Sequence, residues 1–67
     1  MRTYSKYGEK IRRLRKEKDL SQEELGEASG VDPKTIIQIE GGKRNSTLKT
    51  LQKIANALKV PLRDLIP

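Results

Sequence analysis

Apolar residues recur every three or four positions along most of this chain, a spacing typical of amphipathic helices. The two longest rows consist of Tyr4, Tyr7, Ile11 and Leu14, and of Leu48, Leu51, Ile54, Ala55 and Leu58. The alternation of apolar and polar residues that a strand needs is missing, and aromatic residues are scarce. The pattern therefore predicts an all-α chain with helices at residues 5–18, 21–29, 32–40, 47–59 and 61–66.

The middle of the chain carries clear signals for helix ends. Ser21 and Glu24 have the spacing of a capping box, in which each side chain bonds the other residue's backbone N–H. Gly30 stands where a helix end favours a residue free to adopt positive φ. Asp32 and Pro33 then restart a helix, because Asp can accept from its first N–H groups and the φ of Pro is already helical. Residues 21–40 are thus predicted to be two short helices joined by a tight turn.

Two such helices can cross at a steep angle only if their backbones approach closely. Gly26 is the small residue for that approach, since Gly inside a helix costs about 1 kcal/mol relative to Ala and needs a reason. Gly30 supplies the flexible position in the turn. The residues expected to anchor this hairpin to the core are Leu25, Ala28, Val31, Ile36 and Ile39.

Composition narrows the range of functions. The chain has 67 residues, enough for one domain with a small core, and it has no Cys and no His. Disulfides, thiolate nucleophiles, zinc sites with the usual ligands and a His general base are therefore excluded. We expect no enzyme activity, no cofactor and no metal. No apolar run reaches the roughly 18 residues of a membrane span, so we expect a cytoplasmic protein with no membrane contact.

The positive charge is concentrated near the N-terminus. The net charge is +6, and residues 1–18 carry eight basic and two acidic side chains, so the whole excess lies in the first predicted helix and the few residues before it. A basic excess suits a polyanionic partner such as nucleic acid. It equally suits a solvated helix face, so charge alone leaves both interpretations open.

The order and spacing of these motifs resemble the helix-turn-helix domain of the phage repressor and Cro family, also called the XRE family. The matching stretches are IRRLRKEKDLSQEELGEASGVD, TIIQIEGGKRNSTLKTLQKIANALKV and PLRDLI. The resemblance covers about residues 7–66. It implies a compact five-helix, lambda-repressor-like DNA-binding domain. It also implies double-stranded DNA as partner, with members most often being repressors that bind a near-palindromic operator as homodimers.

The third predicted helix would then be the recognition helix. With its two isoleucines at positions 36 and 39 buried, helical geometry turns Lys34, Ile37 and Gln38 outward. Lys34 can donate to guanine, Gln38 can pair with adenine, and Ile37 can pack on a thymine methyl group. Outside this framework they would be ordinary solvated positions. Pro33 departs from the family pattern, because it occupies a position that usually carries a polar base reader.

Other positions match contacts that the family makes with the DNA backbone. They are Gln22, Pro33, Thr35, Lys43, Arg44, Asn45 and Ser46. The resemblance also implies that the side chain of Gln22 braces the recognition helix. The alternative for residues 43–46 is a flexible polar loop. Arg15 and Glu40 match a structural ion pair between the first helix and the end of the third, and we do not count Arg15 among the DNA contacts.

The last predicted helix offers an apolar strip of Leu62, Leu65 and Ile66. One interpretation is a two-fold dimer interface, and the alternative is that these residues close the core of their own chain. A second hypothesis for function uses the same fold as a protein-interaction module, for example an antitoxin or an antagonist of a related regulator. A protein partner would then replace DNA as the main ligand.

Overall fold

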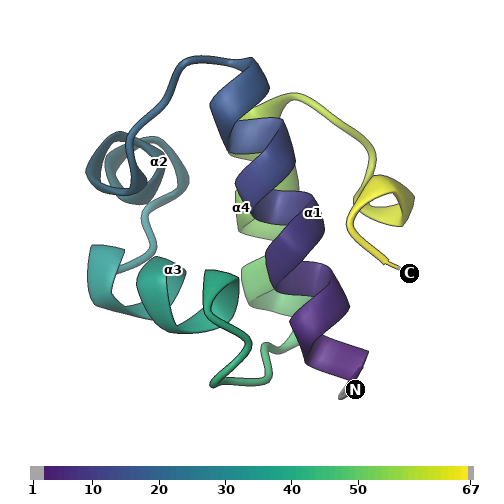
Figure 1. Ribbon diagram of the computed structural model, residues 1–67. Helices are drawn as coiled ribbons and strands as arrows, with labels where there is room; N and C mark the ends of the chain where they lie inside the picture. The colour runs from purple at the N-terminus through teal and green to yellow at the C-terminus, as the bar shows by residue number, and fades with distance from the viewer. Residues whose placement is uncertain (1–2, 67) are drawn as a thin grey trace.

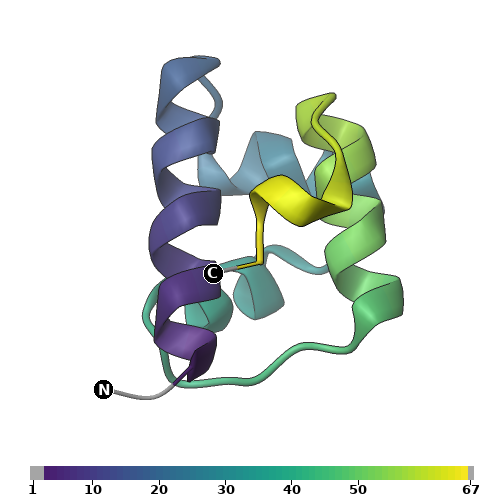
Figure 2. The same cartoon turned by 90° about the vertical axis from the view of Figure 1, so that its right-hand side faces the viewer.

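The computed structural model describes residues 3–66, which form four α-helices and one short 3-10 helix (Figure 1). The elements are α1 (Thr3–Glu17), α2 (Gln22–Ser29), α3 (Pro33–Glu40), α4 (Leu48–Leu58) and η1 (Leu62–Asp64). No strand occurs within this range, so the prediction of an all-helical fold is confirmed. Figure 2 shows α1 and α4 on either side of η1, with α2 and α3 behind them.

The prediction of a fifth α-helix at residues 61–66 is wrong. This segment is a single 3-10 turn, in which the N–H groups of Asp64, Leu65 and Ile66 each donate to a carbonyl three residues back. Such turns are common where a segment is too short for a run of bonds between residues four apart. The turn directs Leu65 into the core, where its side chain is fully buried.

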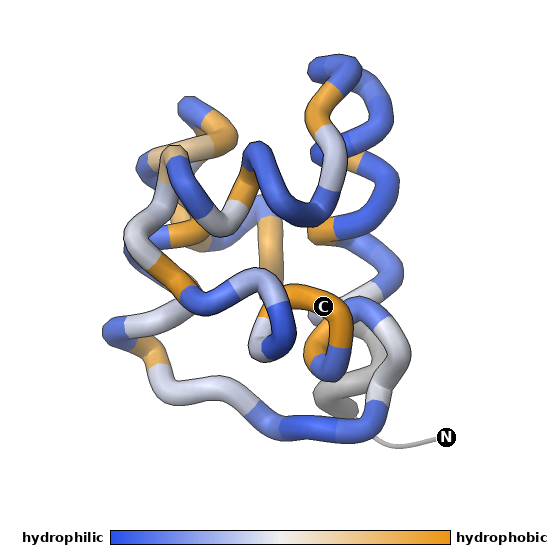
Figure 3. The backbone as a smooth tube through the Cα atoms, turned by 90° about the vertical axis from the view of Figure 1, so that its left-hand side faces the viewer, coloured by the Kyte–Doolittle hydropathy of each residue, from blue (hydrophilic) through white to orange (hydrophobic). Residues whose placement is uncertain are grey.

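Every helix contributes to one core, and Figure 3 shows apolar positions recurring along the chain between hydrophilic ones. The buried apolar residues are Ile11, Leu25, Val31, Ile36, Ile39, Leu51, Ile54, Ala55, Leu58 and Leu65. Two expected core positions are exposed instead. Ala28 lies about 200° around α2 from the buried Gly26, so it faces solvent. Leu48 is the first residue of α4 and projects beyond the core, with 65% of its surface exposed.

All four α-helices end in the same way. Each is followed by a residue in the left-handed region, and these residues are Asp19 (φ 56°), Gly30 (φ 74°), Gly42 (φ 70°) and Lys59 (φ 59°). The N–H of the next residue then donates to a carbonyl five residues back, as in the Schellman motif. These bonds are Leu20 to Arg15 (3.1 Å), Val31 to Gly26 (3.2 Å), Lys43 to Gln38 (3.0 Å) and Val60 to Ala55 (3.1 Å). Each reversal shortens the loop that follows it.

Lys59 adopts a backbone conformation that favours glycine, so Lys59→Gly is expected to stabilise the fold. The relief of strain at φ 59° outweighs the extra freedom of Gly in the unfolded chain, for a net gain of about 0.5–1 kcal/mol. The midpoint of urea unfolding should rise accordingly. Lys53→Gly is the matched control, because Lys53 is exposed in the middle of α4 and the same substitution there should cost roughly 0.5–1 kcal/mol. Equal losses at both positions would contradict the prediction.

Candidate nucleic-acid interface

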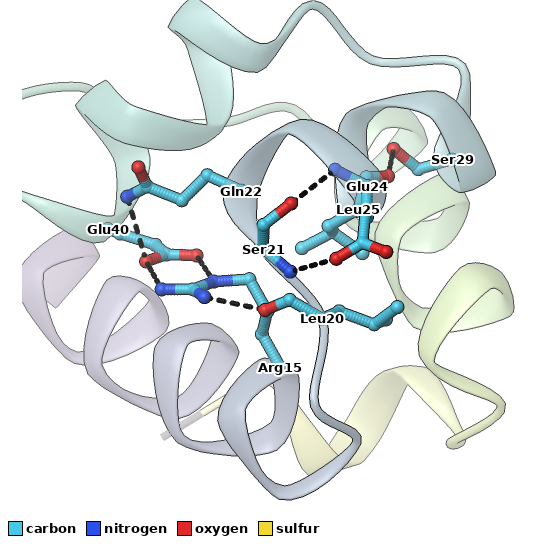
Figure 4. Close-up of polar contacts among 8 residues, drawn as sticks. All are labelled: Arg15, Leu20, Ser21, Gln22, Glu24, Leu25, Ser29 and Glu40. Atoms are coloured by element: carbon cyan, nitrogen blue, oxygen red, sulfur yellow. Dashed lines mark hydrogen bonds and ion pairs between the residues drawn. The ribbon is translucent and has the colours of Figure 1, made fainter.

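The two helices of the hairpin begin at residues whose side chains cap them. Ser21 Oγ accepts from the N–H of Glu24 (3.0 Å), and the N–H of Ser21 donates to Glu24 Oε1 (2.8 Å), which completes the predicted capping box (Figure 4). The backbone bond from Ser21 holds the pKa of the Glu24 carboxyl below its ordinary value. Asp32 Oδ1 accepts from the N–H of Lys34 (2.9 Å), and Pro33 occupies the start of α3. Both helix starts are therefore locally determined.

Gly26 sets how closely α2 approaches the start of α3. A Cβ atom at this position would lie 2.8 Å from the carbonyl oxygen of Val31 and 2.9 Å from Cγ of Pro33. Contacts this short are not tolerated, so only Gly fits and the predicted role of Gly26 is confirmed. Pro33 packs against α2 with one side of its ring and is only partly exposed.

A polar cluster ties α1, α2 and α3 together (Figure 4). Arg15 and Glu40 form a two-pronged ion pair, with Nε to Oε2 at 2.8 Å and Nη2 to Oε1 at 2.9 Å. Arg15 Nη1 also donates to the carbonyl of Leu20 (2.7 Å), and Gln22 Nε2 donates to Glu40 Oε1 (3.2 Å). The hydrogen bond to Glu40 raises the pKa of Arg15 above its ordinary value. The expected ion pair is present, and the bond from Gln22 to Glu40 at the end of α3 is consistent with the bracing role expected of Gln22.

The outer face of α3 carries the three residues expected to read bases. Lys34, Ile37 and Gln38 are all exposed, and Ile37 exposes 50% of its surface. Thr35, expected at the DNA backbone, is partly buried. Ile37 is not part of the core cluster, so its exposed half is available to an apolar group of a partner. The structure thus brings a donor, an apolar group and an amide together on one surface.

A surface hollow lies beside this face and reaches back to α1. It is lined by Arg12, Arg15, Gln22, Ile37, Glu40 and Gly41. The charge of Glu40 is balanced by Arg15, while Arg12 is exposed and makes no ion pair within the described residues. Arg12 therefore gives the hollow its net positive charge. Arg12 was not predicted from the sequence as a site residue, although it precedes Arg15 by one helical turn on the same side of α1.

The loop after α3 folds back beside that helix. Gly42 takes φ 70°, its N–H donates to the carbonyl of Ile39 (3.0 Å), and the N–H of Lys43 donates to that of Gln38 (3.0 Å). Lys43, Arg44 and Asn45 are exposed, and Ser46 is partly buried. The loop therefore has a defined path that places two basic side chains next to the outer face of α3.

The three apolar residues expected at a dimer interface differ in how far they are buried. Leu65 is completely buried in its own chain, so its assignment to an interface is wrong: it has no surface left for a partner. Leu62 is partly buried against the core, and Ile66 is 40% exposed. Lys10 Nζ donates to the carbonyl of Ile66 (3.1 Å), which holds this end of the chain against α1.

Within the described residues, no group of three or more acidic side chains is placed to hold a metal ion. No described helix combines the length and the apolar character that crossing a membrane requires.

Comparison with known proteins finds one family model, described as Helix-turn-helix, that matches residues 11–65. The phage repressor RstR of Vibrio cholerae is 38% identical over 60 residues, which cover 90% of this chain and 54% of RstR. The control protein C.MunI of a Mycoplasma species is 43% identical, and the match covers 90% of this chain and 82% of that protein. The chain thus spans about half the length of RstR and most of the length of C.MunI.

Solved structures of controller proteins are also similar to this chain. The restriction-modification controller protein C.AhdI from Aeromonas hydrophila superimposes with a TM-score of 0.91 at 40% identity, covering 94% of this chain and 96% of that one. The controller protein C.Esp1396I gives a TM-score of 0.88 at 32% identity, with 97% of this chain and 87% of that chain covered.

Proposed function

The chain belongs to the Helix-turn-helix family whose model matches residues 11–65, and from this premise we propose that it is a repressor that binds a near-palindromic operator as a homodimer. It is a DNA-binding transcriptional regulator, in line with relatives named as repressors, regulators and controller proteins. None of those names describes an enzyme.

The observation that carries the proposal is the exposed outer face of α3 on a rigidly held helix. Lys34 can donate to O6 and N7 of guanine, Ile37 can pack on a thymine methyl group, and Gln38 presents an amide. Each good contact of this kind contributes about 1–3 kcal/mol of discrimination between bases. Pro33 has no side-chain donor and packs against α2. The bases are therefore read directly by Lys34, Ile37 and Gln38.

A second set of residues is suited to the DNA backbone. Besides Arg12, it comprises Gln22, Thr35, Lys43, Arg44, Asn45 and Ser46. Thr35 belongs to α3 itself, and the others flank the outer face of that helix from α1, from the start of α2 and from the loop. Contacts from such positions fix the register of a protein on DNA and make its affinity depend on salt. Arg12 is included because it lines the hollow and has no acidic partner in the described structure.

Dimerisation would place two recognition helices on one side of the DNA. Leu62 and Ile66 remain as candidates for a two-fold contact, because both retain exposed apolar surface. In family dimers of this kind, the two helices enter successive major grooves about 34 Å apart. A near-palindromic operator follows from the two-fold symmetry of such a dimer.

Selection from a random DNA library, followed by binding titrations at two salt concentrations, tests the proposal. We expect one enriched sequence and an affinity that falls steeply as salt rises. Lys34→Ala should weaken binding to that sequence roughly 5- to 150-fold and relax specificity at one position, because a base contact is lost.

Lys59→Gly is the charge-matched control, since Lys59 follows the end of α4 farthest from the loop at residues 43–46 (Figure 2). It should leave affinity close to that of the wild type. A wild type that enriches no sequence and shows no salt dependence would contradict the proposal. Full biological activity of Lys34→Ala would favour the protein-interaction alternative.

A further inference from the structure

Gln38 is bound twice by the loop that follows α3. Its backbone carbonyl accepts from the N–H of Lys43 (3.0 Å), and its side-chain Oε1 accepts from Nη1 of Arg44 (3.1 Å). Gly42, at φ 70°, produces the reversal that makes both contacts possible. A residue on the outer face of the recognition helix is thus linked, through main chain and side chain, to two successive loop residues.

The contact with Arg44 decides which end of the Gln38 amide remains available. A glutamine side chain offers one acceptor oxygen and one donor NH₂ group, and these can exchange places by rotation. A guanidinium only donates, so it selects the orientation in which Oε1 faces the loop. Oε1 keeps a second lone pair, but Arg44 turns this oxygen towards the loop, so the group of Gln38 without a partner in the described structure is Nε2, a donor.

Bidentate pairing with adenine requires both ends of the amide at the base edge, since Oε1 accepts from N6 while Nε2 donates to N7. Guanine presents two acceptors, O6 and N7, which a donor satisfies without the oxygen. Building on the proposed function, we propose that Arg44 determines the base preference of Gln38, holding it as a donor that favours guanine over adenine. Arg44 is then a positioning residue acting through Gln38, in addition to any contact with phosphate.

A purely electrostatic role for Arg44 predicts a different outcome. A lysine or arginine on a phosphate strengthens binding to all sequences alike and increases the salt dependence. A residue that orients a base reader changes the ranking of sequences. Lys43 is the matched control, because it is basic, exposed and adjacent, and its side chain makes no hydrogen bond or ion pair with another described residue.

The experiment compares library selections with the full-length wild type and with Gln38→Ala, Arg44→Ala, Lys43→Ala and the double variant Gln38→Ala/Arg44→Ala. Gln38→Ala identifies the position that Gln38 reads, as the one where discrimination disappears. At that position the wild type should prefer guanine, and Arg44→Ala should shift the ratio of adenine to guanine binding about tenfold towards adenine. Lys43→Ala should weaken binding uniformly, and the double variant should show the preference of Gln38→Ala alone.

Two results would overturn the inference while leaving the proposed function intact. One is a uniform loss of affinity in Arg44→Ala with an unchanged base preference, which would make Arg44 a phosphate contact only. The other is a wild-type preference for adenine at the Gln38 position. A wild type that selects no sequence at all would overturn the proposed function, and this inference with it. Thermal unfolding of each variant confirms that the exposed substitutions leave the fold unchanged.

Discussion

Gly8→Ala is expected to remove most of the free energy of unfolding of this domain, although the same substitution inside an ordinary helix stabilises it by about 1 kcal/mol. Gly8 lies in α1 and is buried where that helix meets the end of α3. An added Cβ would overlap the carbonyl oxygen of Ile39 and would lie 3.0 Å from both Cα and O of Glu40. These are backbone atoms, so no side-chain rotation can relieve the overlap.

The two helices would have to move apart, and the core beneath them would lose contacts. Overpacking at a core position costs about 1–3 kcal/mol, and more where the obstacle is backbone. A domain of this size has a total stability of about 3–10 kcal/mol. We therefore expect Gly8→Ala to lose about 3 kcal/mol or more, which is most of the stability of a domain near the lower end of this range.

Urea unfolding followed by circular dichroism measures this loss. Gly41→Ala is the control for glycine replacement at the same helix contact region, because φ there is −78° and the nearest atom to an added Cβ is 3.3 Å away. Its stability should differ from the wild type by less than about 1 kcal/mol. If Gly8→Ala instead gained stability, the close contact between α1 and α3 would not exist in solution.

Sequence reasoning identified Gly26 but missed Gly8, although both are glycines inside helices. Gly26 belongs to two helices adjacent in the chain, so a local motif suggested what it packs against. The partner of Gly8 is the end of α3, far along the sequence, and no local pattern marks that contact. Close contacts between segments that are distant in the sequence could therefore not be predicted.

The residues that end the helices were likewise predicted only in part. Gly30 could be predicted as a left-handed position because glycine is the usual residue there. Asp19 and Lys59 hold equivalent positions with residues that rarely adopt positive φ, so composition gave no indication of them. At the C-terminus, the apolar spacing indicated a helix, whereas the need to bury Leu65 against α4 produces a 3-10 turn.

The candidate interface was partly predictable for a similar reason. Burial of two isoleucines in α3 determines which neighbours face outward, so Lys34, Ile37 and Gln38 could be named from periodicity alone, and their side chains are exposed. The contact between Arg44 and Gln38 depends on the path of the loop after Gly42. The position of Arg12 beside the hollow depends on how α1 packs against α3.

Glu40→Ala is expected to cost about 3 kcal/mol of stability, because it leaves the guanidinium of Arg15 without its partner. The two side chains are 10% and 3% exposed, so water from the neighbouring hollow replaces the lost carboxylate only in part. Gln22 loses the acceptor of its Nε2 at the same time. Glu27→Ala is the control, since Glu27 is exposed on α2 and its removal should change stability by no more than about 0.5 kcal/mol. Equal stability of the two variants would show that the pair is solvated.

The double variant Arg15→Met/Glu40→Leu separates stability from positioning. Replacing a buried ion pair by apolar residues of similar size is often neutral or stabilising, so the free energy of unfolding should recover most of the loss seen in Glu40→Ala. DNA affinity should not recover with it, because the side chain of Gln22 is held beside α3 only by Glu40 among its described hydrogen bonds. Titration of both variants against the selected operator makes the comparison. Recovery of affinity together with stability would limit the ion pair to a structural role, whereas recovery of stability alone would show that it also orients Gln22 towards the DNA.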